Sequence, residues 1–175
     1  MEYWDIYDVN RQKTDGTVQR GQKQSKGEYR LVVHVCIFNS NGQMLIQQRQ
    51  PFKKDWSGKW DVTVGGCSVS GETSATAAER ETLEEIGLKL DLSETRPHLT
   101  MNFSDGFDDW YILKRDADIS NLTLQHEEVR QVKWASEEEI TNMINSGEFI
   151  PYRQSLISLI FEICGGEFGY GAHRA

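Results

Sequence analysis

The stretch Gly66-Cys-Ser-Val-Ser-Gly-Glu72, followed after seven residues by Arg80-Glu-Thr-Leu-Glu-Glu-Ile-Gly-Leu88, decides the fold of this chain. Its second part has the pattern of one amphipathic helix. At about 100° per residue, Glu81, Glu84 and Glu85 fall within one arc of the helix surface. Carboxylates at this spacing repel one another unless a cation holds them, and Mg²⁺ and Mn²⁺ prefer oxygen ligands. The spacing therefore predicts a metal site suited to a diphosphate.

The expected helix has signals at both ends. Thr73 can serve as its N-cap, because a hydroxyl there accepts from the unpaired amides of the first turn. Gly87 stands where a left-handed residue would end the helix, with the apolar Leu88 after it. Small, apolar or branched residues recur at steps of three and four, which predicts a core-facing stripe opposite the glutamates, made of Ala75, Ala78, Thr82 and Ile86.

Two features predict how the preceding loop meets this helix. The pair Gly65-Gly66 would let the backbone turn sharply off a strand and come close to a ligand. Arg80 would bridge back to Glu72, or along the helix to Glu84, and so fix the loop on the helix.

The spacing of these residues resembles the signature of the Nudix family, the MutT-like hydrolases of nucleoside diphosphates linked to another group. That signature reads glycine, five residues, glutamate, seven residues, Arg-Glu, an aliphatic residue, any residue, Glu-Glu, any residue, glycine and an aliphatic residue. The matching positions are Gly66, Glu72, Arg80, Glu81, Glu84, Glu85, Gly87 and Leu88. Thr82 departs from the pattern, because an aliphatic residue is usual there, and we interpret it as a variation in packing.

The resemblance implies an α/β fold, the Nudix-type α/β/α sandwich with a mixed central sheet. The order of strands and helices expected along the chain agrees with it. It implies Mg²⁺ or Mn²⁺ as cofactor, and the metal ligands that it implies are Glu81, Glu84, Glu85 and the carbonyl oxygen of Gly65. Glu85 is the strongest candidate among them. Arg80 is placed with the catalytic residues, and Glu72 becomes an outer contributor.

Hydrolysis also needs a general base, and the sequence offers two candidates. Some Nudix enzymes use a glutamate of the signature, which here would be Glu81. Others use a glutamate on a later loop, six residues before a tryptophan, and Glu128 stands six before Trp134. Glu127 and Glu128 could equally be acidic loop residues before a strand.

Composition limits the class of protein. The chain has 175 residues, of which 38% are hydrophobic and 26% charged, as in a soluble globular domain. A net charge of −8 argues against a binder of nucleic-acid polymers, which would usually carry a basic face. The three cysteines are widely spaced, which favours a reducing cytoplasm. We expect no signal peptide, no membrane span and no membrane partner.

Residue patterns predict the other strands. A strand pattern over 1–9 and the turn signal Asp15-Gly16 predict an N-terminal hairpin. We interpret 10–30 as a solvated extension, in preference to a flap that meets substrate phosphates. The apolar run 31–38 predicts a strand buried on both faces, and further strands are expected at 44–49, 60–64, 99–103, 109–115 and 129–134.

Two further helices are expected near the C-terminus. Ser136 and Glu139 have the spacing of a capping box. Pro151 suits the first turn of a final helix that runs to about Cys164. The residues of that helix expected to pack on the sheet are Leu156, Ile157, Leu159, Ile160 and Ile163. The whole chain, 1–175, is expected to form a single Nudix domain, with 1–30 as a hairpin extension and 165–175 as a flexible tail.

Some residues keep two interpretations. His34 lies within an apolar run, where a core histidine is favoured over a ligand. Trp56 and Trp60 are expected to pack in the core or at its rim in preference to binding substrate. The loop 104–108 combines acidic and aromatic residues, and could hold a base or sugar or be an ordinary hairpin loop.

Three functions remain open. The leading one is a metal-dependent pyrophosphohydrolase that acts on a small-molecule diphosphate. The second is an isomerase, because residues 4–8, Arg20-Gly21 and Phe38-Asn39 resemble the Nudix subgroup similar to isopentenyl-diphosphate isomerase. The third is a non-catalytic module that binds a nucleotide metabolite. The resemblance leaves the substrate unnamed, and it leaves a homodimer open.

The residues that an isomerase needs decide between the first two functions. Alignment on Gly71-Glu72 puts Gly65 where the isomerase has its cysteine, and Cys67 comes two residues too late. The segment before the apolar strand offers Lys23 and Arg30 in place of metal-binding histidines, and cationic side chains cannot ligate a metal as imidazoles do. The signature glutamates needed for hydrolysis are complete, so we expect hydrolysis.

Overall fold

A computed structural model describes residues 1–166. The expected flexible tail, 165–175, therefore lies almost wholly outside the described residues. Contacts within the chain divide it into two compact units. Unit 1 comprises 1–35, 64–84 and 88–111, and unit 2 comprises 36–63, 85–87 and the chain from 112 onward. The expectation of a single domain stays a prediction.

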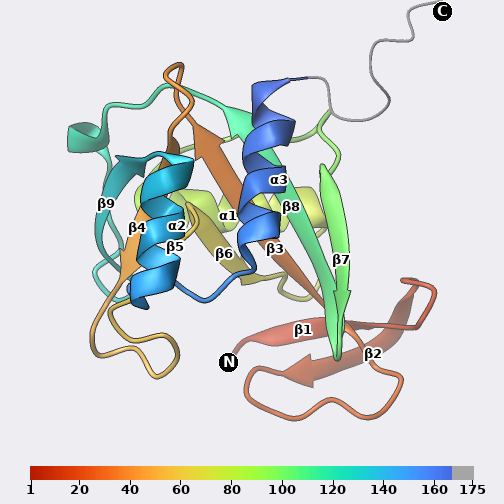
Figure 1. Cartoon of the computed structure of the whole chain (residues 1–175). Helices are drawn as coiled ribbons and strands as arrows, with labels where there is room; N and C mark the ends of the chain where they lie inside the picture. The colour runs from red at the N-terminus through yellow and green to blue at the C-terminus, as the bar shows by residue number, and fades with distance from the viewer. Residues whose placement is uncertain (167–175) are drawn as a thin grey trace, which may run out of the picture. The chain divides into compact units, whose positions relative to one another are not determined.

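Unit 1 holds the N-terminal strands and most of the helix that carries the glutamates. Its elements are β1 (Tyr3–Tyr7), β2 (Lys13–Gln19), the first part of β3 (Arg30–Phe38), β6 (Val64–Cys67), most of α1 (Ser74–Ile86), β7 (Leu99–Phe103) and the first part of β8 (Gly106–Lys114). β1 and β2 form a two-stranded antiparallel sheet of their own, which Figure 1 shows in red and orange.

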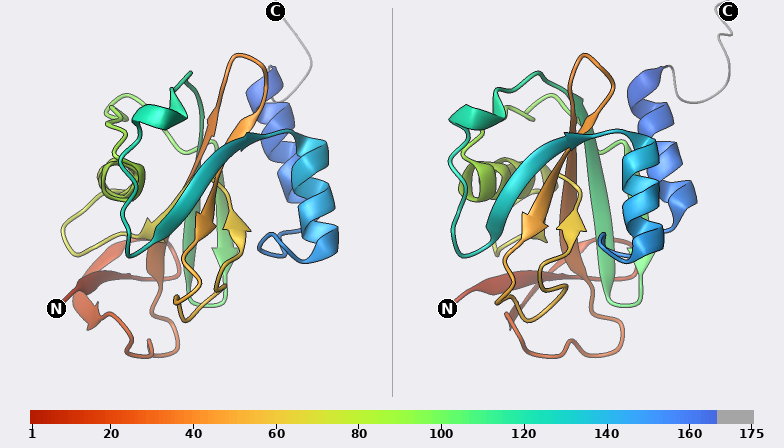
Figure 2. Two further views of the ribbon diagram at one scale, coloured as in Figure 1. Left: turned by 90° about the vertical axis from the view of Figure 1, so that its left-hand side faces the viewer. Right: turned by 60° about the vertical axis from the view of Figure 1, so that its left-hand side comes forward.

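Unit 2 holds the remaining strands and the other helices. Its own elements are β4 (Met44–Arg49), β5 (Trp60–Asp61), the 3₁₀-helix η1 (Ile119–Asn121), β9 (Val129–Ala135), α2 (Glu137–Ser146) and α3 (Gln154–Gly165). β4 pairs with β5 and along its length with β9, which lies beside it in Figure 2. α2 and α3 contact each other and lie side by side in Figure 1.

The main sheet is mixed, as predicted. Its strand order is β5-β4-β3-β8-β7, with β6 paired to β3 and β9 to β4. The pairs of β3 with β4 and β6, of β4 with β5 and β9, and of β7 with β8 are antiparallel. β3 and β8 run in the same direction, because the amide of Arg30 bonds to the Asp105 carbonyl at one end and the amide of Arg115 to the Phe38 carbonyl at the other.

Helix α1 confirms the predicted ends. The hydroxyl of Thr73 accepts from the Thr76 amide at 3.2 Å, as an N-cap does. Gly87 has a φ of 70°, the left-handed conformation that ends many helices. Ala78, Thr82 and Ile86 are fully buried, which confirms most of the predicted stripe, while Ala75 is half-buried.

The N-terminal hairpin is confirmed, but its predicted turn is wrong. The chain turns at 8–12, where Arg11 has a φ of 59°. The carboxylate of Asp8 accepts from the amides of Asn10 and Gln12 at 2.9 and 2.8 Å and so fixes the turn. Asp15 and Gly16 lie inside β2, where the absence of a side chain at Gly16 leaves room for Ile6. The extension 10–30 is accordingly part strand.

Two other strand predictions need correction. The expected strand 60–64 is divided, because Val62 and Thr63 separate β5 from β6 and the Thr63 hydroxyl bonds to the Ile37 amide at 2.9 Å. β8 begins at Gly106 and not at residue 109, so the loop 104–108 shrinks to a tight hairpin turn. The hairpin is confirmed, and the alternative that its residues hold a base or sugar stays a prediction.

The C-terminal predictions are mostly confirmed. Ser136 and Glu139 form the capping box of α2. α3 begins at Gln154, not at Pro151, with Arg153 as its N-cap. Ile157, Ile160 and Ile163 are buried as expected, and Leu156 and Leu159 are half-buried. No helix among residues 1–166 is long and apolar enough to cross a membrane.

The two tryptophans around residue 58 differ. Trp60 is buried, as expected, and the ammonium of Lys133 lies over its ring at 5.1 Å. Trp56 is 47% exposed and has a φ of 51°, so the packing predicted for it is wrong. A left-handed Trp56 places the loop backbone in a conformation that bulky residues rarely adopt.

The N-terminal hairpin is held against the loop before α1. Trp4, Ile6 and Val18 form a buried cluster that packs on Cys67 at the end of β6. The carboxylate of Asp5 is 4% exposed and accepts from the Ser70 hydroxyl at 2.7 Å and the Gly71 amide at 2.8 Å. Burial raises the pKa of Asp5, but the bonds from Lys13, Gly71 and Ser70 outweigh it, so the net pKa is lowered.

We predict that Asp5→Ala lowers the free energy of unfolding by about 2–4 kcal/mol at neutral pH, because buried partners lose their acceptor. Urea unfolding measures this, with the exposed Asp15→Ala of the same hairpin as the control, expected within about 0.5 kcal/mol of the wild type. Because the pKa of Asp5 is lowered in the folded protein, its carboxylate stabilises the fold at pH values above the ordinary pKa. The difference in free energy of unfolding between Asp5→Ala and the wild type should therefore disappear as the pH falls through the lowered pKa. Equal loss of stability in Asp5→Ala and Asp15→Ala would contradict the role of Asp5 in holding the loop.

Candidate active site

Arg80 joins the loop before α1 to the helix itself. Its Nε donates to Glu72 at 2.6 Å and its Nη2 donates to the Cys67 carbonyl at 3.1 Å. Its Nη1 meets Glu81 at 3.0 Å and Glu84 at 3.1 Å. The hydrogen bond to Glu72 is the largest cause of a raised pKa at Arg80, so the guanidinium stays charged. The predicted bridges to Glu72 and Glu84 are both present.

The Glu81 carboxyl is largely buried, with 15% of the side chain exposed, and stands over a glycine. Burial raises its pKa to about 7 and the charges of Glu84 and Glu2 add to the rise, although Arg80 opposes it. A Cβ at Gly66 would lie 2.2 Å from Oε1 of Glu81, so the carboxylate occupies the space that any side chain there would need. The Glu81 carboxyl is therefore poised to change protonation near neutral pH.

The pair Gly65-Gly66 does not form the sharp turn that its sequence suggested. Both glycines lie in β6, paired with His34 and Val33 of β3. Because the glycines have no side chains, other groups can lie close to them. The Glu81 carboxylate lies beside Gly66, and a Cβ at Gly65 would stand 3.0 Å from the imidazole of His34. The expectation that the pair comes close to a ligand stays a prediction.

His34 is the satisfied core histidine that the sequence favoured. Its Nδ1 lies 2.7 Å from Oδ1 of Asp108, and its ring stacks on Trp110 at 4.1 Å. Sequence reasoning assigned Asp108 to a loop and so missed this partner. Alternation along a strand starting at Gly106 was the signal that could have found it.

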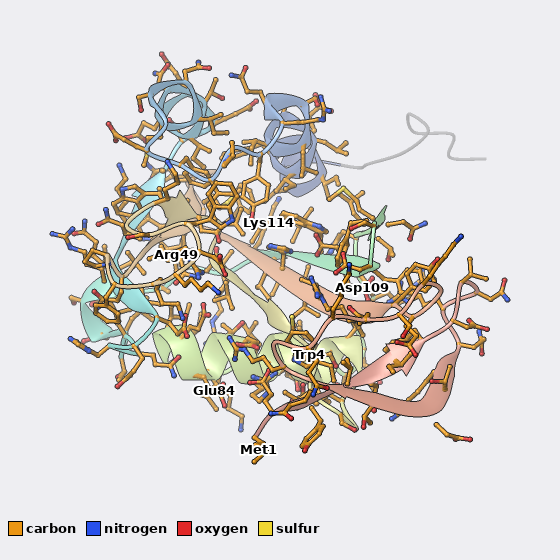
Figure 3. The ribbon with its side chains drawn as sticks, turned by 90° about the horizontal axis from the view of Figure 1, so that it is seen from below. Met1, Trp4, Arg49, Glu84, Asp109 and Lys114 are labelled. Carbon is orange, nitrogen blue, oxygen red and sulfur yellow. The ribbon has the colours of Figure 1, made fainter. Side chains whose placement is uncertain are left out.

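Glu84 and Glu85 have opposite surroundings. The side chain of Glu84, labelled on α1 in Figure 3, is 51% exposed and pairs with Arg80. Glu85 is 4% exposed, and its Oε2 accepts from Nε2 of Gln47 at 2.8 Å within unit 2. The expectation that all the glutamates lie opposite the core-facing stripe is therefore wrong for Glu85. No signal in the sequence pointed to Gln47.

Glu128, the other candidate base, lies in unit 2 in an ion pair. Its carboxylate meets the ammonium of Lys53 at 2.5 Å. Its amide bonds to the Gln125 carbonyl at 3.0 Å, and the Gln125 amide bonds to the Glu85 carbonyl at 2.9 Å. The loop that carries Glu128 is thus joined to the last turn of α1. Lys53 was not singled out from the sequence.

The donors fit a hard divalent ion in their chemistry. Carboxylate oxygens and a carbonyl are the ligands that Mg²⁺ and Mn²⁺ prefer, and a cation would offset the burial of Glu81. Among residues 1–166, no three acidic, histidine or cysteine groups stand close enough to hold a metal as they are placed. The assignment of Gly65, Glu81, Glu84 and Glu85 as ligands, and of Arg80 and Glu128 as catalytic residues, stays a prediction.

Comparison with known proteins decides the family. The model of the NUDIX domain matches residues 28–153. The chain belongs to the Nudix family. It is 48% identical over 152 residues to an uncharacterised Nudix hydrolase of Listeria monocytogenes, covering 87% of this chain and 90% of the relative. The predicted membership of the Nudix hydrolases, which act on acid anhydrides of phosphorus-containing substrates, is thereby confirmed.

A solved structure confirms the fold class. The crystal structure of the protein DR0079 from Deinococcus radiodurans matches with a TM-score of 0.72 and 26% identity, covering 93% of this chain and 99% of that one. This Nudix protein is thus an α/β/α sandwich with a mixed sheet. An isopentenyl-diphosphate Delta-isomerase of Pectobacterium atrosepticum is 34% identical over 91 residues, which cover 52% of this chain and 49% of the isomerase. The subgroup resemblance is consistent with that match.

We predict that Glu81→Gln stabilises the metal-free protein at neutral pH by about 2–3 kcal/mol, since its raised pKa makes ionisation in the folded state unfavourable. The unfolded carboxyl ionises near pH 4.5 and the folded one near pH 7, so the wild type should lose stability between these values while the variant does not. Urea unfolding at about pH 4.5 and about pH 8 with EDTA measures this.

Glu84→Gln is the matched control on the same helix, because its side chain is half exposed. Added Mg²⁺ should stabilise the wild type more than Glu81→Gln. Parallel stability curves for the wild type and Glu81→Gln would contradict the buried, titrating carboxyl.

Proposed function

We propose that this Nudix hydrolase is a metal-dependent pyrophosphohydrolase that cleaves the diphosphate linkage of a nucleoside diphosphate joined to another group. The observation that carries the proposal is the placement of Glu81, a largely buried carboxyl that stands against Gly66 on a helix that also carries Glu84 and Glu85. Such a carboxyl is costly to a fold unless a cation or a proton offsets it. A bound Mg²⁺ or Mn²⁺ would neutralise diphosphate charge and lower the pKa of a bound water.

The residues of the chain have separate tasks in this proposal. Glu81, Glu84, Glu85 and the Gly65 carbonyl supply oxygen ligands. Arg80 keeps Glu81 and Glu84 oriented through Nη1, and its other nitrogens hold the loop through Glu72 and Cys67. Gln47 orients the carboxylate of Glu85. Placement of the ligands by bonds to neighbours is what makes a metal site selective.

We infer that Glu81, and not Glu128, takes the proton from the attacking water. A base works best when its pKa lies near the working pH, and the pKa of Glu81 is about 7. Glu128 is engaged by Lys53, so it would have to lose that ion pair before it could accept a proton.

The surroundings of Cys67 support hydrolysis over isomerisation. Burial raises the pKa of the Cys67 thiol to about 11, so the thiol is protonated and unreactive at neutral pH. Gly65 provides no functional group where an isomerase has its cysteine. The match to the Pectobacterium isomerase covers about half of each chain, whereas the Listeria hydrolase matches over most of both.

The proposal includes three further expectations, which concern the type of substrate, the cellular compartment and the oligomeric state. The partner is a small-molecule diphosphate and not a nucleic-acid polymer, in keeping with a net charge of −8. Cys36, Cys67 and Cys164 are free thiols, which supports a cytoplasmic setting. A homodimer stays open and is tested by light scattering of the full chain.

The test is a turnover assay of the full chain with Mg²⁺ or Mn²⁺. Nucleoside diphosphate sugars, ADP-ribose, dinucleoside polyphosphates and isopentenyl diphosphate are supplied separately, and the products are resolved by chromatography. We expect hydrolysis of at least one nucleoside diphosphate derivative and loss of that activity in EDTA. Formation of a dimethylallyl product from isopentenyl diphosphate, abolished in Cys67→Ala, would favour the isomerase instead.

We predict that Glu85→Gln folds and loses at least about 10²-fold in turnover, because it removes charge from a site that must stabilise developing charge. The amide oxygen of the variant can still accept from Gln47, so the fold should be retained. Circular dichroism checks the fold, and Glu138→Gln, an exposed change on α2, is the control. Turnover close to that of the wild type would refute the assigned site.

For the base, we predict that Glu81→Gln removes the acidic limb of the pH–rate profile, while Glu128→Gln keeps it. The limb reports the protonation of the base, which in Glu81 occurs near pH 7 before metal binds. Glu127→Gln is the neighbouring control for the change at Glu128. Loss of the limb in Glu128→Gln alone would reverse the assignment.

A further inference from the structure

The carbonyl group of Gly65 points away from the strand beside it. β6 pairs with β3, next to it in Figure 1, and Gly65 stands opposite His34. Just beyond the paired residues, the Ser68 amide bonds to the Leu31 carbonyl at 2.9 Å. In an antiparallel pair, hydrogen-bonded positions alternate with non-hydrogen-bonded ones, so Gly65, three residues before Ser68, is at a non-hydrogen-bonded position. Its N–H and C=O groups are therefore directed to the other edge of β6.

A second carbonyl shows what that edge faces. Cys67 stands two residues along β6, so its carbonyl is directed to the same edge as that of Gly65. There it accepts from Nη2 of Arg80 at 3.1 Å. The edge that carries the Gly65 carbonyl thus faces α1, and all of these residues belong to unit 1. α1 is the helix that carries the proposed ligands Glu81 and Glu84.

An imidazole lies against the backbone of Gly65. Facing residues approach most closely at non-hydrogen-bonded positions, and a Cβ at Gly65 would stand 3.0 Å from Cδ2 and 3.1 Å from Nε2 of His34. At the next residue, Gly66, the corresponding space is taken by the Glu81 carboxylate. Successive residues of a strand face opposite ways, so β6 is held between His34 on one face and Glu81 on the other.

The imidazole of His34 is itself fixed by two residues of β8. Its Nδ1 lies 2.7 Å from Oδ1 of Asp108, and its ring stacks on that of Trp110 with centroids 4.1 Å apart and planes 10° apart. The side chains of His34 and Asp108 are 14% and 13% exposed, and Trp110 is buried. A largely buried ring with a bonded nitrogen and a stacked neighbour has little freedom to turn, so it presents a rigid surface to Gly65.

A glycine carbonyl that binds a metal needs such support. Glycine has no Cβ, and its backbone can adopt a wide range of φ and ψ. A metal ligand must be held in one direction, and loss of a neighbour that orients a ligand typically lowers metal affinity by about 10- to 100-fold. Removal of the imidazole would free the peptide group of Gly65 to tilt.

We propose that His34 and Asp108 are positioning residues for the carbonyl oxygen of Gly65, and that they set how tightly the enzyme binds Mg²⁺ or Mn²⁺. This rests on the proposed function, in which the Gly65 carbonyl is a ligand. His34 acts through packing and does not bind the metal, because Nδ1 is engaged by Asp108 and the Nε2 edge lies against the backbone of Gly65.

The experiment is a calorimetric titration of the full chain with Mn²⁺. His34→Ala removes the ring and Asp108→Ala removes the group that fixes it, and we expect each to weaken Mn²⁺ binding about tenfold or more. Asp105→Ala is the matched control, since it removes a carboxylate from the same β7–β8 hairpin that pairs with Arg30 instead. We expect its affinity to stay that of the wild type.

Two outcomes of this titration contradict the proposal. Equal affinity in the wild type, His34→Ala and Asp108→Ala would overturn the positioning role. An equal loss in Asp108→Ala and Asp105→Ala would assign the effect to charge alone, and would overturn it too.

A spectroscopic readout separates positioning from loss of the fold. In protein labelled with ¹³C-glycine, the NMR signal of the Gly65 carbonyl carbon should shift when Mg²⁺ is added to the wild type, and should shift less in His34→Ala. Spectra in EDTA show whether the variant keeps its fold, and Asp108→Ala replaces it if it does not. An equal shift in the wild type and the folded variant would overturn the proposal.

A double variant tests the contact itself. Gly65→Ala adds a methyl group 3.0 Å from the imidazole, so the backbone must move, and we expect Mn²⁺ binding to weaken about tenfold or more. In the His34→Ala background the methyl group has room, and the same change should cost less than about threefold. Equal effects in the two backgrounds would show that the imidazole does not hold Gly65.

The metal titration also distinguishes the two proposals. A wild type that binds no Mn²⁺ would overturn both of them. A wild type that binds Mn²⁺ and hydrolyses its substrate, with variants at His34 and Asp108 that bind Mn²⁺ equally well, would overturn the positioning role and leave the pyrophosphohydrolase proposal intact.

Discussion

The ion pairs of Arg80 are the interaction on which the rest of unit 1 depends. One guanidinium touches the end of β6 through the Cys67 carbonyl, the loop through Glu72, and α1 through Glu81 and Glu84. Glu72 in turn accepts from the Val69 amide at 2.9 Å, which fixes the loop backbone. A planar group with five donors can satisfy such a set at once, and a lysine cannot. The helix, the strand before it and the loop between them are therefore set by one side chain.

Sequence reasoning succeeded where a single local signal decides the structure. The ends of α1 follow from Thr73 and Gly87, and the α2 cap from Ser136 and Glu139, because each is a contact within one turn. It failed where a distant partner decides. The turn signal Asp15-Gly16 was overridden because Asp8 captures the amides of the real turn and Ile6 needs the space beside Gly16.

At the candidate site too, local contacts were predicted from the sequence and distant contacts were not. Spacing alone predicted that Arg80 meets Glu72 and Glu84, but it could not foresee that Glu85 is buried and bonded to Gln47, from a strand well before the helix. The glycines were predicted to approach a ligand, and in the structure the groups beside them are His34 and Glu81, which come from other elements. Three glutamates that look alike in the sequence end in three environments, one over a glycine, one at the surface and one beside an amide.

The contacts of Asp5 have a consequence for where this domain begins. The family match starts at residue 28, yet Asp5 supplies the acceptor for Ser70 and Gly71 in the loop before α1. A boundary drawn from the family model alone would cut away the strand that covers Cys67 and would leave that thiol open to oxidation. The smallest piece of this chain able to keep its loop in place is thus larger than the segment that the family model matches.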